Sequence, residues 1–136
     1  MFKTILFPID LSRESRQAMD VALNVVKTYS GRLVLLSVAA SPAAGEESAS
    51  PVTATPEAIA ELLTNAKQLF AEQGINAETI EREGIPAFVI CDVADEVEAD
   101  LIVMGSRGMG LTDEGAADSV SNRVINLSPC PVLIVP

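Results

Sequence analysis

Residues 99–110 read ADLIVMGSRGMG, a short apolar run that passes directly into a loop rich in glycine. The run from Leu101 to Met104 contains no polar residue, which is typical of a strand that a parallel sheet buries on both faces. Gly105 follows it, and two more glycines come shortly after, where the chain has to turn out of such a sheet. The stretch therefore predicts a buried parallel strand that ends in a tight turn.

Four more runs of β-branched and apolar residues are spaced along the chain, at Thr4–Ile9, Arg32–Val38, Ala77–Glu81 and Val132–Val135. The first, the second and the last are almost continuously apolar, as strands buried on both faces require. The third reads AETIE, and its alternation of residue types predicts a strand nearer the edge of the sheet.

Apolar residues recur at helical spacing in each interval between two of these runs. Helices are expected from Ser12 to Gly31, from Pro56 to Gly74, from Pro86 to about Glu98, and from Val120 to Leu127. Strand and helix thus alternate throughout, which predicts right-handed crossovers and a doubly wound parallel α/β sheet of five strands with helices on both faces.

The length of 136 residues suits a single domain over residues 1–136. Residues 39–54, AASPAAGEESASPVTA, offer little to bury and predict a flexible loop after the second strand. No apolar run reaches the roughly 18 residues that a membrane-spanning helix needs. No secretory segment is recognisable near the start, so we expect a cytoplasmic protein.

The residue types exclude several classes of function. A net charge of −10 without a Lys/Arg cluster makes nucleic acid and anionic membranes poor partners. The chain has no histidine, so neither a Ser-His-Asp nucleophile nor a histidine zinc site can be assembled. Its two cysteines, Cys91 and Cys130, are interpreted as small buried apolar residues rather than as reactive thiols. The acidic run from Asp92 to Asp100 is interpreted as a solvated face.

Known phosphate-binding motifs fit the glycine-rich stretch poorly. A dinucleotide fingerprint needs its glycines after the first strand, where this chain has DLSRES. A P-loop needs Lys-Ser/Thr after its second glycine, but Ala116-Ala117 stands there. A phosphate-accepting signalling domain needs an acidic pair after the first strand, and Asp10 stands alone.

Four stretches together resemble the universal stress protein family. They are FPIDLSRESRQA at 7–18, EGIP at 83–86, ADLIVMGSRGMG at 99–110 and SVSNRVINLSPCPVLIVP at 119–136. The resemblance covers essentially the whole chain. It implies a five-stranded parallel sheet with helices on both faces, and a cytoplasmic stress-response protein that acts by binding, as a regulatory or protective partner with little or no catalysis.

The nucleotide-binding branch of that family is similar to a pattern of G-x-x-G, nine residues, then G-S/T. Gly105 and Gly108 supply the first half, and residues 109–117 are the nine, but Asp118-Ser119 stands where Gly-Ser is expected. Asp118 is a departure from the motif that brings a negative charge toward the expected phosphates. Two interpretations stay open: Asp118 caps the next helix and weakens triphosphate binding, or it serves as an oxygen ligand of Mg²⁺ and so supports ATP.

The resemblance also implies a set of candidate nucleotide-binding residues. Its adenosine side is Pro8, Ile9, Asp10 and Val38; Met104 and Gly105 flank it; its phosphate side is Gly108, Ser119, Val120 and Ser121, with Arg107 in reach. Asp10 is equally suited to cap the following helix. AMP, ADP or ATP is the expected ligand, with Mg²⁺ if it is ATP, and no catalytic or metal-binding residue is assigned.

The last strand predicts how copies of the chain associate. Its sequence VLIV carries no charge, and an uncovered edge strand of this kind is an aggregation hazard. Together with the family resemblance, this predicts a homodimer through the C-terminal strand. Two rival functions remain: a competent ATP binder with slow hydrolysis, and an interaction module that needs no ligand.

Overall fold

The computed structural model describes residues 2–9, 13–40, 56–105 and 120–135. These ranges contain a sheet of five parallel strands in the order β3-β2-β1-β4-β5. The strands are β1 Thr4–Pro8, β2 Arg32–Ala40, β3 Glu78–Gly84, β4 Leu101–Gly105 and β5 Val132–Val135. The predicted fold class is therefore confirmed.

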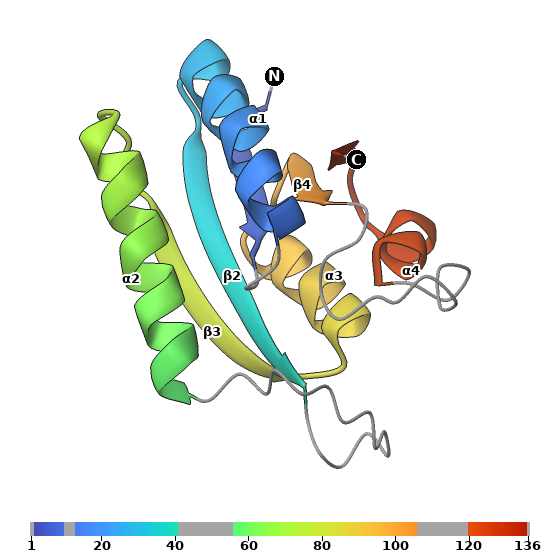
Figure 1. Cartoon of the computed structure of the whole chain (residues 1–136). Helices are drawn as coiled ribbons and strands as arrows, with labels where there is room; N and C mark the ends of the chain where they lie inside the picture. The colour runs from blue at the N-terminus through green and yellow to red at the C-terminus, as the bar shows by residue number, and fades with distance from the viewer. Residues whose placement is uncertain (1, 10–12, 41–55, 106–119, 136) are drawn as a thin grey trace.

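Two layers of helices cover the sheet, one on each face (Figure 1). The helices are α1 Arg13–Tyr29, α2 Pro56–Glu72, α3 Pro86–Glu96 and α4 Val120–Leu127. Helices α1 and α2 contribute residues such as Ala22 and Phe70 to one hydrophobic cluster. Helices α3 and α4 contribute residues such as Ile90 and Val124 to a second cluster on the opposite face.

The strands at the centre of the sheet are apolar on both faces because each face carries a helical layer. In β1, Ile5 and Phe7 belong to the cluster under α1 and α2, whereas Leu6 belongs to the cluster under α3 and α4. All three side chains are fully buried. The period of two along a strand thus produces the continuous apolar runs of the sequence.

The predicted boundary between the second strand and the loop after it was wrong. Strand β2 runs to Ala40, so residues 39 and 40 belong to the sheet and not to the predicted loop. The strand is longer because β3 stays paired with it, as far as the pair Ala40–Gly84. The rest of that predicted loop, residues 41–54, lies outside the described residues.

Charged side chains line strand β3, which is at one edge of the sheet (Figure 1). Arg32 of β2 donates two hydrogen bonds to the carboxylate of Glu78, one of them 2.9 Å long, and these lower the pKa of Glu78. Arg82 of β3 donates to Glu96 of α3 at 3.0 and 3.1 Å, and the pKa of Glu96 is lowered in the same way. Both pairs are exposed, so water and salt screen them.

Asp100 forms hydrogen bonds with the backbone at the start of β1, although the sequence predicted that it lies on a solvated face. Its Oδ2 accepts hydrogen bonds from the backbone N–H groups of Lys3 and Thr4, each 3.0 Å long. Its own N–H donates to the carbonyl oxygen of Thr4 at 2.7 Å. The carboxylate therefore satisfies two backbone donors at the start of β1.

We expect Asp100→Ala to lower the free energy of unfolding by about 1.5–3 kcal/mol, because two hydrogen bonds to a charged acceptor are lost. Urea denaturation monitored by circular dichroism measures the change. The control is Asp92→Ala, which removes an exposed carboxylate of α3 and should change the free energy by less than about 0.5 kcal/mol. Equal losses in the two variants would show that the Asp100 hydrogen bonds do not stabilise the fold.

Candidate functional site

The strand order places a topological switch point between β1 and β4. From β1 the chain adds β2 and then β3 toward one edge of the sheet. It then returns to the other side of β1 and adds β4 and β5 toward the opposite edge. Connections that follow β1 and β4 consequently leave the sheet in opposite directions. In open α/β sheets, ligands bind outside the carboxyl ends of the strands at such a switch point.

The strand registers bring predicted residues from three strands to this carboxyl edge. Leu6 pairs with Ile102, and Pro8 and Met104 each lie two residues further along their strands. On the other side Pro8 pairs with Leu36, so Val38 lies two residues beyond that pair.

Two more predicted residues continue these strands. The N–H of Ile9 donates to the carbonyl oxygen of Leu36 at 2.8 Å, so Ile9 extends the ladder past the end of β1. Gly105 is the last residue of β4 and pairs with Val135. Residues that are far apart in sequence therefore share one edge of the sheet.

These residues differ in how much surface they offer. Ile9 is 1% exposed and packs under α1 and α2, whereas Met104 is 3% exposed and packs under α3 and α4. Pro8 is also buried, but Val38 and Gly105 are half-buried. Val38 packs against the cluster under α3 and α4, and its apolar side chain lies at the carboxyl edge of the sheet.

The phosphate side of the predicted site falls mostly outside the described residues. Arg107, Gly108, Asp118 and Ser119 all lie there, and so does Asp10 of the adenosine side. Val120 and Ser121 are the first two residues of α4, and their backbone is helical. The helix thus begins where the sequence predicted it.

Sequence analysis did not single out Ser37, the residue before Val38. Among the residues that the structure describes, Ser37 is the polar residue that is buried, with 4% of its surface exposed. Strand alternation places it on the same face as Leu35, under α1 and α2. A serine inside the apolar run RLVLLSVAA was the available signal.

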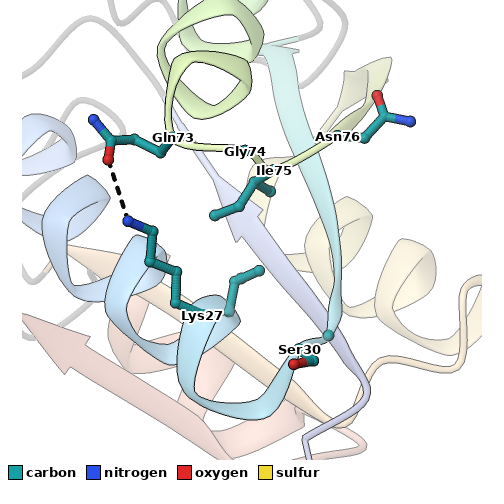
Figure 2. Close-up of a pocket in the computed structure, with 8 residues that line it drawn as sticks. Lys27, Ser30, Gln73, Gly74, Ile75 and Asn76 are labelled. Carbon is teal, nitrogen blue, oxygen red and sulfur yellow. Dashed lines mark hydrogen bonds between the residues drawn. The ribbon is translucent and has the colours of Figure 1, made fainter.

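At the opposite end of the strands, described residues line a surface hollow of about 410 Å³ (Figure 2). It lies between the end of α1 and the turn that joins α2 to β3. Lys27 Nζ donates across it to Gln73 Oε1 at 3.2 Å, and Ile75 points into it (Figure 2). This hollow is therefore distinct from the predicted site at the carboxyl edge.

Neither a metal cluster nor a membrane span is found in the described parts of the chain. Within residues 2–9, 13–40, 56–105 and 120–135 there is no group of three or more His, Cys, Asp or Glu side chains that could hold a metal ion. No helix in these ranges is both long and apolar enough to cross a membrane.

The topology places the chain in the class of open parallel α/β proteins, whose ligands generally bind at the switch point of the sheet. The family model described as "Universal stress protein family" matches residues 1–136. The chain belongs to the universal stress protein family. It is 57% identical over 136 residues to "Universal stress protein Sll1654" of Synechocystis sp., a match that covers all of this chain and 87% of that protein.

Solved structures show the same fold. Universal stress protein UspA from Lactobacillus plantarum is 27% identical, with a TM-score of 0.84, and the match covers 99% of this chain and 98% of that one. A universal stress protein solved in complex with cAMP is 26% identical, with a TM-score of 0.79 and coverage of 99% and 97%. Both relatives therefore match over nearly their full length.

Proposed function

We propose that this protein binds an adenine nucleotide at the carboxyl edge of β1, β2 and β4, and that it acts in the cytoplasm through binding rather than catalysis. The observation that carries the proposal is the convergence of Pro8, Val38 and Gly105 on the switch point of the sheet. The relative that was solved with cAMP supports an adenine ligand for this fold.

The adenosine part of the ligand is assigned to the edge formed by Pro8, Ile9 and Val38. Val38 offers half-buried apolar surface there, which suits the face of an adenine ring. Asp10 follows directly in sequence and supplies a polar contact to ribose or adenine in this proposal. Met104 and Gly105 border the ligand from the neighbouring strand β4.

The phosphate part of the ligand is assigned to Arg107, Gly108 and Ser119 to Ser121. The start of α4 at Val120 supports this, because a helix N-terminus offers free N–H groups and a positive dipole end to an anion. Asp118 opposes it: two unit charges about 4.5 Å apart repel by about 4 kcal/mol at an effective dielectric near 20. We therefore propose that a monophosphate binds better than a triphosphate.

The proposal includes a homodimer through β5. Leu133 on this edge strand is 37% exposed, and the strand carries no charge. The other edge strand, β3, carries Glu78, Glu81, Arg82 and Glu83, which protect an edge from pairing with another chain. The contrast between the two edges favours β5 as the one that a second copy covers.

Val38→Glu tests the assigned adenosine edge. A carboxylate at Val38 would be buried against the apolar ligand face without a partner, so we expect AMP affinity to fall by about tenfold or more, which is about 1.4 kcal/mol. Isothermal titration calorimetry with AMP measures it.

The matched control is Val97→Glu, because Val97 is also half-buried against the same cluster but lies after α3, at the far end of the sheet. We expect this variant to bind AMP like the wild type. If both variants bind AMP like the wild type, the adenosine edge is not where we place it.

A further inference from the structure

Cys91 lies on the flank of α3 that faces away from β3. The flank toward β3 is identified by two residues: Glu96, which accepts hydrogen bonds from Arg82, and Val89, whose Cγ2 lies 2.8 Å from where a Cβ on Gly84 would be. Each helical residue turns the chain by about 100°, so Cys91, two residues after Val89, points about 200° away from that flank. Helix α4 packs against α3 (Figure 1). Because β3 and β5 are the opposite edges of the sheet, a side chain of α3 that points away from β3 points toward α4 and β5.

Cys130 lies in the short connection between α4 and β5. Ser128 holds this connection: its N–H donates to the carbonyl oxygen of Val124 at 2.8 Å, and its Oγ accepts from the N–H of Cys130 at 3.1 Å. The carbonyl oxygen of Pro131 accepts from Ile102 of β4 at 3.0 Å. Cys130 is therefore fixed next to the sheet, on the side toward which Cys91 points.

The environments of the two thiols overlap. Both cysteines are free and half-buried, and both pack against the hydrophobic cluster under α3 and α4. Burial raises the pKa of Cys91 most, followed by the charges of Asp92 and of Cys130. The direction of Cys91, the position of Cys130 and the shared cluster place both thiols on the same side of the molecule, beside α4.

We propose that Cys91 and Cys130 are an oxidant-sensitive pair that closes to an intrachain disulfide and so links α3 to the start of β5. The oxidant is a peroxide. It oxidises the thiolate of Cys130 to a sulfenic acid and leaves as hydroxide; the thiol of Cys91 then attacks the sulfenic sulfur, the S–S bond forms and water is released. A dithiol reductant reverses the link.

Ser128 favours Cys130 as the thiol that reacts first. The Ser128 hydroxyl donates to the carbonyl oxygen of Cys130 at 2.7 Å. Cys130 Sγ lies 3.8 Å from Ser128 Oγ and is an alternative acceptor for this hydroxyl. This contact lowers the pKa of Cys130 against the larger effect of burial, which raises it. Burial, Asp92 and Cys130 all raise the pKa of Cys91, and no hydroxyl lowers it. Burial makes the reaction slow at neutral pH, so the pair stays reduced until oxidant persists.

The test is peroxide treatment of the reduced full-length protein, followed by thiol titration, intact mass and peptide mapping with and without dithiothreitol. The expected result is loss of both thiols within one chain, a mass lower by about 2 Da, and a peptide pair that joins Cys91 to Cys130. Once Cys130 carries the sulfenic acid, the link should close at least about tenfold faster in the folded protein than in urea, because only the fold holds the two thiols together.

Three variants complete the design. Cys91→Ser and Cys130→Ser should each keep the native circular dichroism spectrum and form no intrachain link. Only Cys91→Ser should accumulate a sulfenic acid that a dimedone probe labels. Ser128→Ala should slow the link without abolishing it. The proposal is overturned if the folded wild type keeps both thiols, links different chains, or closes the link from the sulfenic acid no faster than the unfolded chain does.

Discussion

Phe70→Ala is expected to lower the free energy of unfolding by about 3–5 kcal/mol. Phe70 on α2 is 1% exposed, and its ring meets the ring of Phe7 on β1 edge to face, with centroids 6.4 Å apart. The truncation leaves a cavity between helix and sheet that the central strand cannot close. Urea denaturation followed by circular dichroism gives the free energy.

Leu69→Ala is the matched control, because Leu69 is the preceding residue on the same helix and is 50% exposed. We expect this change to cost less than about 1 kcal/mol. If the two variants unfold at the same urea concentration, the packing of α2 on β1 does not carry the stability that the structure assigns to it.

Leu133→Lys is expected to convert the proposed dimer into a monomer. The change puts a charge in the middle of the β5 edge, where it would be buried without a partner between two copies. We expect the dissociation constant to rise by about a hundredfold or more, which is about 2.7 kcal/mol. Sedimentation equilibrium at micromolar concentration distinguishes a dimer from the 14.3 kDa single chain.

Thr79→Lys is the control for that change, because Thr79 is exposed on the opposite edge strand, β3. This variant should sediment as the wild type does. A wild type that is already monomeric, or a Leu133→Lys variant that remains dimeric, would contradict an interface through β5.

The fold could be predicted because burial on both faces leaves a strong local pattern. Runs such as Leu101–Met104 are apolar throughout, since a helical layer lies on each side of the strand. Strand β3 was predicted less well: the predicted strand ended at Glu81, but β3 continues from Arg82 to Gly84. These residues have no apolar pattern and are in the sheet because β2 pairs with them. Pairing with a neighbouring strand decides such an edge, and a single sequence does not show it.

The ends and anchors of the elements also depend on tertiary contacts. Helix α3 ends at Glu96 rather than near Glu98, which has a left-handed backbone with φ of 56°. Asp100 was interpreted as part of a solvated face because its two backbone partners are more than ninety residues away in sequence. Cys91 and Cys130 are half-buried, not fully buried as expected, since each lies beside the packed cluster rather than inside it.

The part of the candidate site that lies at strand ends could be predicted from the sequence. Pro8, Val38 and Gly105 could be placed at one edge because parallel strands have their carboxyl ends together. Ser37 was missed although it interrupts the apolar run RLVLLSVAA, because such a run does not show what the serine side chain packs against. The roles of Asp10, Arg107 and Asp118 remain proposals from sequence.

The most direct test of the account is calorimetric titration of AMP and of ATP, each with and without Mg²⁺, into the wild type and Asp118→Gly. We predict that the wild type binds AMP but not ATP, and that the glycine variant gains ATP binding because the repulsion of about 4 kcal/mol is removed. If the wild type binds Mg²⁺-ATP as tightly as the variant does, Asp118 does not weaken the phosphate site. If neither protein binds any nucleotide, the account of an adenine-nucleotide site is wrong.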